Sequence, residues 1–295
     1  MALKDKPPLK RRLVEWGYRR LLARAQGINF NAEASATDFR RRFGEANGRI
    51  TVIPNALDSE LPERANEDPG ETAREVLKGP TLITMGRLIP VKGHIPLIRA
   101  FARIRRNHPS ARLILLGEGP LRPSLETAIR DLGLQDAVFL PGFQANPHSW
   151  VARSSVFVLP SRAEGFPNAL LEAMALGTCS VATDCPSGPR ELIAPGSDLS
   201  EQTARAEWTP YGVLTPPLPA EDPSPTDPLE PAEEELAAVL DTLLREGDIR
   251  EQCGTRARER TKAYAPEKVL PLWEDLIRKA VAGNSQEPAG TADRR

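Results

Sequence analysis

The chain has 295 residues, 40% hydrophobic and 27% charged, which is the ordinary balance of a soluble globular protein. Its 39 basic and 40 acidic residues leave a net charge near zero, so nothing in the overall charge favours nucleic acid as a partner. No apolar run approaches the roughly 20 residues that span a bilayer, and Met1 opens no signal-peptide pattern. Three cysteines without metal-ligand spacing fit a reducing compartment, so a cytoplasmic location is expected.

The amino-terminal segment has the pattern of a basic amphipathic helix. Within residues 9–25, apolar side chains recur near helical spacing at Leu13, Trp16, Leu21 and Leu22. Residues 1–26 carry eight basic and two acidic side chains, which leaves a local charge of +6. Through residues 4–24 such a helix could lie peripherally on the anionic inner face of a membrane. The more ordinary interpretation is a solvated basic face on a packing helix.

Residues 27–57 predict a short strand, a helix and a second strand, at residues 27–31, Glu33–Phe43 and 49–53. Gly44 ends the helix, and the pair Pro54-Asn55 ends the second strand. Residues 58–80 are polar and are interrupted by Pro62, Pro69 and Gly70, which predicts a linker or an irregular excursion.

From Thr81 onward, expected strands and helices alternate regularly. The strands are expected at residues 81–85, 112–116, 137–140, 156–159, 179–183 and 211–214. The helices are expected at residues 95–106, 121–132, 146–153, 168–176 and 189–193. The strands are apolar throughout, which is typical of a parallel sheet covered on both faces. Right-handed crossovers would make it a doubly wound, Rossmann-like α/β fold.

The carboxyl-terminal third begins with a proline-rich loop. Residues 216–231 contain seven prolines and are expected to be exposed. Three helices are expected after this loop, at residues 233–244, 249–262 and 267–281. Residues 284–295 are expected to be disordered.

The stretch Ser161–Glu172, which reads S-R-A-E-G-F-P-N-A-L-L-E, has the clearest chemistry. A buried strand enters a turn with Glu164, and a helix then carries Glu172. A helix start offers unpaired backbone N–H groups and the positive end of a dipole, so it suits a phosphate. Carboxylates accept hydrogen bonds from sugar hydroxyls. The stretch therefore predicts a ligand that is anionic at one end and hydroxylated at the other.

Other suggestive residues also follow strands, where open parallel sheets bind their ligands. They are Gly86-Arg87 with Lys92, Gly117-Glu118-Gly119, and Pro141-Gly142-Phe143. Two cations that face a helix start are suited to clamp a diphosphate. Each group alone has a plainer interpretation, a tight turn for the glycines and solvated charges for the cations. Their convergence on one edge of the sheet carries the prediction.

Four blocks of the sequence resemble the nucleotide-sugar domain of family-4 (group 1) retaining glycosyltransferases of the GT-B fold. They are Gly86-Arg87-(four residues)-Lys92-Gly93, Gly117-x-Gly119-Pro120, Phe139-Leu140-x-Gly142, and Pro160-Ser161-x-x-Glu164-Gly165-Phe166-(five residues)-Glu172-Ala173-Met174-Ala175-x-Gly177. The resemblance is clear over residues 49–214. The stretch Asp184–Glu191 looks like the bacterial members that build surface polysaccharides and oligosaccharides.

The resemblance implies a role for each matching residue. Arg87 and Lys92 would bind the donor diphosphate and stabilise its charge as it departs, with no need for a metal. Glu164 would contact the donor sugar, and Glu172 would accept hydrogen bonds from the ribose hydroxyls. Further donor contacts are implied for Gly86, Gly117, Gly119, Gly142, Phe143, Gly165, Phe166, Asn168 and Ala169. No cofactor is implied; the donor is expected to be a UDP-sugar, and the acceptor a saccharide or a lipid-linked sugar.

Two departures from the family pattern stand out. Pro167 takes a position that is often glycine; proline lacks an N–H but suits the first helical position, and the Asn168 amide could compensate. The second departure concerns the family's amino-terminal acceptor domain, because this sequence resembles only the last elements of that domain. The histidines of this chain lie in the donor half, and none matches the active-site histidine of that domain; they are His94, His108 and His148.

The domain division implied by the resemblance has four parts. Residues 1–48 would be a remnant of the acceptor domain, and residues 49–265 the donor domain. Residues 266–283 would be the helix that crosses back to the absent domain, with apolar side chains exposed, and residues 284–295 a tail.

Three functions follow as alternatives. The first is a truncated or split glycosyltransferase whose acceptor domain is a separate subunit. The second is a non-catalytic nucleotide-sugar-binding module. The third, a nucleotide-sugar epimerase of the same architecture, is disfavoured because the Glu-x7-Glu spacing fits the transferases better.

Overall fold

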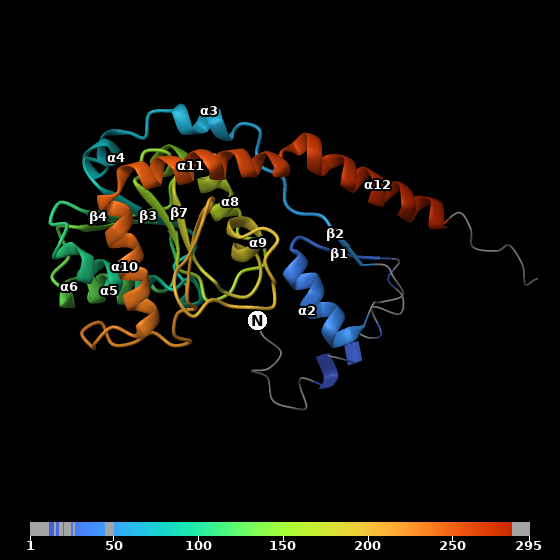
Figure 1. Ribbon diagram of the computed structural model, residues 1–295, viewed down its shortest axis with the longest axis horizontal. Coiled ribbons are helices and arrows are strands. Elements are labelled where there is room, and N and C mark those ends of the chain that lie inside the picture. Colours follow the sequence, from blue (N-terminus) through green and yellow to red (C-terminus); the bar gives the residue numbers. More distant parts are fainter. Residues whose placement is uncertain are drawn as a thin grey trace, which may run out of the picture.

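A computed structural model describes residues 27–44 and 50–284, together with positions 12–14, 16, 17, 20 and 25. Its centre is a seven-stranded sheet in the order β5-β4-β3-β6-β7-β9-β8 (Figure 1). The strands are β3 (Thr81–Met85), β4 (Arg112–Leu116), β5 (Val138–Gly142), β6 (Val156–Leu159), β7 (Ser180–Thr183), β8 (Glu207–Thr209) and β9 (Gly212–Thr215). Every pairing is parallel except that of β8 with β9. The predicted Rossmann-like α/β fold is confirmed.

Helices cover both faces of this sheet, which is why strands β3, β4, β6, β7 and β9 are buried almost throughout. One face carries α5 (His94–Arg105), α6 (Arg122–Asp131) and α10 (Pro231–Arg245). The other carries α3 (Leu61–Asn66), α4 (Glu71–Val76), α7 (His148–Val151), α8 (Asn168–Ala175) and α9 (Pro189–Ile193). Successive residues of β3, Leu82 and Ile83, enter the two hydrophobic clusters on opposite faces, because side chains alternate along a strand. Helix α11 (Gly247–Thr261) contributes to both clusters.

The structure corrects the sequence prediction at three places. Residues 58–80 contain two helices, α3 and α4, because Pro62 lies in the first turn of α3 and Gly70 is the N-cap residue of α4. The short edge strand β8 was not predicted. Strand β5 continues through Gly142, which therefore does not lie in the turn after the strand.

The amino-terminal part forms its own small unit. Strands β1 (Ile28–Phe30) and β2 (Ile50–Val52) pair in parallel, and α2 (Glu33–Phe43) lies between them in the chain with the predicted bounds. Positions 12–14, 16, 17 and 20 are helical, and Leu13 and Trp16 are exposed. The rest of the predicted basic helix lies outside the described residues.

The carboxyl-terminal helix α12 (Pro266–Asn284) projects away from the sheet (Figure 1). Most of its apolar side chains are exposed, among them Leu270, Leu272, Trp273 and Ile277. The exposure predicted for these four side chains is confirmed, whereas Leu276, which was also predicted to be exposed, is half-buried. The predicted tail, beyond residue 284, lies outside the described residues. No helix in the described part of the chain has the length and apolar character needed to cross a membrane.

Candidate functional site

The strand order reverses once, in the middle of the sheet. The chain runs outward from β3 through β4 to β5, then returns to place β6, β7 and β9 on the other side of β3. Open α/β sheets bind ligands at the carboxyl edge beside such a reversal. The loops that flank it carry Arg87 and Lys92 after β3, and Glu164 after β6.

Lys92 and Glu164 are in contact across this reversal. Lys92 ends the 3-10 turn η3 (Pro90–Lys92), and its Nζ lies 2.6 Å from Glu164 Oε1, 72 residues later in the chain. Their side chains are only 24% and 10% exposed, so solvent screens this ion pair less than a surface pair. Arg87 is exposed, and its guanidinium has no hydrogen bond or ion pair to any residue that the structure describes. One cation is therefore paired, and the other is available to an anion.

Arg162 holds the turn that carries Lys92. The Arg162 backbone N–H donates to Val91 O at 2.8 Å. Its guanidinium donates to the carbonyl oxygens of Pro90 and Pro219 and to Asp222 Oδ1, the last at 2.6 Å. Because Pro219 and Asp222 belong to the proline-rich loop, Arg162 joins that loop to the Lys92 turn.

His94 follows the Lys92 turn but does not add a third cation. Its side chain is fully enclosed, and this burial lowers the pKa of His94 to about 4, so the imidazole is neutral near pH 7. His94 Nε2 lies 3.3 Å from Arg87 O, within reach of a hydrogen bond to the backbone of that loop. His94 therefore adds no positive charge to this edge near pH 7.

Three predicted donor-binding glycines assemble the edge of the sheet. A Cβ at Gly117 would lie 2.0 Å from Gly86 O, and a Cβ at Gly119 would lie 2.4 Å from Leu88 O. The loops after β3 and β4 therefore touch backbone to backbone, which only glycine permits. Gly142 is buried in β5, and its carbonyl accepts the Gly117 N–H at 3.0 Å. Backbone packing accounts for Gly117 and Gly119, and a positive φ of 82° accounts for Gly142.

The start of α8 differs from the prediction in one detail. Pro167 is the N-cap residue and not the first helical residue, and it packs against Gly188, where a Cβ would lie 2.3 Å from Pro167 Cδ. The Asn168 Oδ1 accepts a hydrogen bond from Asn55 Nδ2 at 2.8 Å. Gly165 is exposed, and a Cβ there would meet no atom within 4 Å. Protein packing therefore does not require a glycine at position 165.

Glu172 projects from the second turn of α8 and meets a histidine. Its Oε2 lies 3.1 Å from His148 Nε2, on α7. The sequence patterns gave no role to His148, because the family match offers none at that position. The predicted helix at residues 146–153 includes His148, but the sequence does not indicate which neighbouring helix the His148 ring contacts.

Two predicted aromatic residues have opposite environments. Phe143 follows β5 and is 78% exposed at the carboxyl edge, so its ring can offer a face to a ligand. Phe166 is buried, and its ring centroid lies 5.8 Å from that of Tyr264. Phe166 therefore belongs to the core, and only its backbone remains for a ligand.

The stretch Asp184–Glu191 joins the carboxyl edge of the sheet to the amino-terminal unit. The Glu191 carboxylate accepts the backbone N–H groups of Glu33 and Ala34, at 2.9 and 2.8 Å, at the start of α2. Ser35 and Ser187 hydroxyl oxygens are 3.0 Å apart beside it. The amino-terminal unit is therefore fastened next to the Glu164 turn, whose N–H donates to Pro186 O at 3.3 Å.

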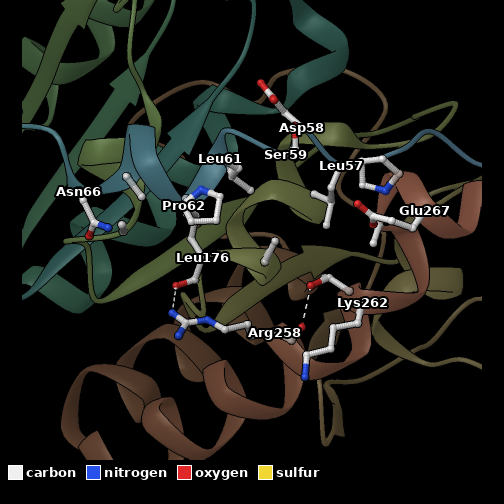
Figure 2. A pocket seen from close by; sticks show the side chains of 16 residues that line it. Leu57, Asp58, Ser59, Leu61, Pro62, Asn66, Leu176, Arg258, Lys262 and Glu267 are labelled. Carbon is white, nitrogen blue, oxygen red and sulfur yellow. Dashed lines mark hydrogen bonds between the residues drawn. The ribbon is translucent and has the colours of Figure 1, made fainter. Parts of the chain in front are cut away.

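A cavity of about 650 Å³ lies elsewhere, between α3, the end of α8, α11 and the start of α12 (Figure 2). Leu57, Leu61, Leu176, Arg258 and Lys262 are among its lining residues, and none of the predicted site residues is. Among the described residues, no group of three His, Cys, Asp or Glu side chains could hold a metal ion.

The sequence matches the profile of a known protein family. Residues 71–206 match the family described as Glycosyl transferases group 1. The chain is 33% identical over 240 residues to an uncharacterized glycosyltransferase of Methanocaldococcus jannaschii, an alignment that covers 80% of this chain and 59% of that protein.

A second curated relative, from Campylobacter jejuni, is named N-acetylgalactosamine-N,N'-diacetylbacillosaminyl-diphospho-undecaprenol 4-alpha-N-acetylgalactosaminyltransferase. It is 30% identical over 250 residues, which are 84% of this chain and 59% of that enzyme. Among solved structures, Anabaena HepE in complex with UDP and glucose aligns with a TM-score of 0.70 at 22% identity, over 86% of this chain and 64% of that one. The chain spans 59% of the length of both curated relatives.

Proposed function

We propose that this chain, whose residues 71–206 are a group 1 glycosyltransferase domain, binds the donor of a sugar transfer. The donor is a nucleoside diphosphate sugar, and the reaction is a retaining, metal-independent transfer. Its binding site is the carboxyl edge of the seven-stranded sheet, beside the reversal between β3 and β6. Residues 49–265 act as the donor domain, and residues 27–44 belong to the acceptor side.

The contact between Lys92 and Glu164 carries this proposal. It joins a predicted phosphate-binding cation to a predicted sugar-binding carboxylate, 72 residues apart, at 2.6 Å. Arg87 adds a second cation in the same loop. Together they would hold the diphosphate and stabilise the negative charge that develops on it as the glycosidic bond breaks. Glu164 would face the sugar, and Glu172 the ribose.

Uridine is the base we propose first. HepE was solved with UDP and glucose, and it shares the fold of this chain. The exposed ring of Phe143 lies at the same edge and would stack on the base. Backbone N–H groups from Gly165 to Ala169 would cradle the sugar and the phosphate.

An acceptor half would complete the active site. The Campylobacter relative is named for a diphospho-undecaprenol-linked acceptor, and this chain spans 59% of that enzyme. We therefore propose a saccharide or lipid-linked acceptor, held by a separate acceptor domain that packs on the exposed apolar side chains of α12. A cytoplasmic position at the inner face of a membrane, through residues 4–24, would suit a lipid-linked acceptor.

Calorimetric titration of the chain with UDP, ADP and GDP tests the proposal. We expect UDP to bind with a Kd below 1 mM, because two cations and a helix start converge on its phosphates. The absence of a binding signal with all three nucleotides at millimolar concentration would refute donor binding. A non-catalytic module would bind UDP equally well but would transfer no sugar from UDP-sugars after an acceptor domain is supplied.

Gly165→Ala is expected to weaken UDP-sugar binding about fivefold, since an added methyl group in a filled site costs about 1 kcal/mol. Its thermal unfolding should match the wild type, because a Cβ at this position meets no protein atom within 4 Å. Gly247→Ala is the matched control, with no protein atom nearer than 3.6 Å and a position far along the chain in α11. If Gly165→Ala binds the UDP-sugar as tightly as the wild type, this turn is not part of the binding site.

A further inference from the structure

His148 is a buried histidine with one ring nitrogen that has no hydrogen-bond partner among the described residues, which destabilises the folded state. It is 9% exposed, and its Nδ1 has no hydrogen-bond partner among the described residues. A buried polar atom without a partner destabilises the folded state, so an apolar side chain would serve better in a purely structural position. The hydrogen bond that the ring does make is directed at Glu172.

The proton on this imidazole can be assigned from its partner. A carboxylate oxygen only accepts hydrogen bonds, so the His148 Nε2 that lies 3.1 Å from Glu172 Oε2 must be the donor. The backbone holds the ring in this direction. His148 is the first residue of α7, whose N-cap residue is Pro147, and Asn146 ties this turn to the Arg64 carbonyl at 2.7 Å.

We infer that His148 is a positioning residue for nucleotide binding, which holds the Glu172 carboxylate in the direction that receives the ribose hydroxyls. This inference rests on the proposed function. Glu172 is 29% exposed, and a free glutamate side chain samples many rotamers, which binding must freeze at an entropic cost. The His148 hydrogen bond removes part of that cost before the nucleotide arrives. Oε1 and the second lone pair of Oε2 remain for the two hydroxyls.

The test compares two nucleotides that differ only in the ribose. UDP carries both hydroxyls, and 2′,3′-dideoxyuridine diphosphate carries neither, so the second ligand cannot use Glu172. We expect His148→Ala to weaken UDP binding about threefold to tenfold in calorimetry and to leave dideoxy-UDP binding unchanged, because coupled neighbours lose their coupling when either one is removed. Glu172→Ala should show the same selectivity with a larger loss for UDP.

Two substitutions at the same position separate hydrogen bonding from bulk. The amide nitrogen of glutamine reaches the place of the imidazole Nε2, whereas that of asparagine reaches only the place of Nδ1. His148→Gln should therefore restore UDP affinity to within about twofold of the wild type, and His148→Asn should not. His108→Ala is the matched control, because His108 Nε2 also contacts a carboxylate, Asp241 Oδ1 at 3.1 Å, away from the sheet edge.

The outcomes are distinct. Equal weakening of UDP and dideoxy-UDP by His148→Ala, or no weakening of either, would overturn the positioning role while donor binding stands. If the wild type binds UDP and dideoxy-UDP equally, the ribose is not recognised and the inference falls. If the wild type binds neither nucleotide, the proposed function fails and the inference falls with it.

Discussion

Replacing Lys92 with methionine is expected to weaken UDP binding about 10- to 100-fold. A hydrogen bond to a charged partner contributes about 1.5–3 kcal/mol, and each 1.4 kcal/mol is a factor of ten in affinity. Methionine keeps the length and the apolar stem of lysine, so the change removes the charge with little loss of packing. Calorimetry with UDP measures the effect directly.

The ion pair with Glu164 requires two companion variants. Lys92→Met leaves a largely buried carboxylate without its partner, which alone could distort the turn. Lys92→Met combined with Glu164→Gln removes both charges and should still bind UDP weakly. Glu164→Gln alone should bind UDP no less tightly than the wild type, because the carboxylate competes with phosphate for Lys92. Lys78→Met, at an exposed pair with Glu75, is the control, and unchanged affinity in Lys92→Met would contradict the phosphate clamp.

Glu233→Ala is expected to destabilise the fold by about 3–5 kcal/mol, because it leaves a fully buried arginine without its charged partner. Arg99 is 1% exposed, and its Nε and Nη2 donate to the two Glu233 oxygens at 2.8 and 3.0 Å. The same guanidinium donates to the carbonyls of Ser224 and Pro228, so it also fastens the proline-rich loop to α5. Urea denaturation followed by circular dichroism measures the loss.

The neighbouring Glu234 gives a control in the same helical turn. It is exposed, so Glu234→Ala should change the free energy of unfolding by no more than about 0.5 kcal/mol. Replacing both members of the buried pair, Arg99→Met with Glu233→Leu, should recover part of the stability, because neither charge is then left unpaired. The recovery is incomplete because the Ser224 and Pro228 carbonyls and the Glu230 N–H lose their partners. A Glu233→Ala protein as stable as the Glu234→Ala protein would show that Arg99 finds water or another acceptor.

The sheet could be predicted because its strands are buried on both faces. Fully buried strands such as Thr81–Met85 and Val156–Leu159 are found where they were predicted. Residues 58–80 were predicted to be irregular but contain two helices, because proline and glycine occur at helix starts as readily as in loops. Strand β8 was missed because it is three residues long and half-exposed, so no apolar run marks it.

The site was predictable as far as backbone topology determines it. Parallel strands bring the ends of β3 and β6 to one edge, so strand order brings the loops that carry Lys92 and Glu164 close together. The contacts of His148 with Glu172 and of Asn55 with Asn168 depend on side-chain directions on separate elements. Periodicity says which face of a helix is buried but not which polar atom it meets.

The glycines show a different limit of the sequence pattern. Gly117 and Gly165 both match the family blocks, yet only Gly117 is required by the packing of this chain. A motif therefore mixes residues that build an edge with residues that leave space at it. The space around each Cβ in the structure distinguishes these two kinds of glycine, and the sequence does not.

The cap on α2 also constrains the order in which this protein acquires structure. Glu191 is synthesised 158 residues after Glu33, whose N–H it accepts. A ribosome adding about 5–20 residues per second therefore makes it roughly 8 to 32 s later. Until then α2 has only Ala32 at its start, which supplies no side-chain cap, and an isolated helix of 11 residues is marginal in water. This early-made helix is thus stabilised by a late-made residue, so its cap is completed only after α9 has been synthesised.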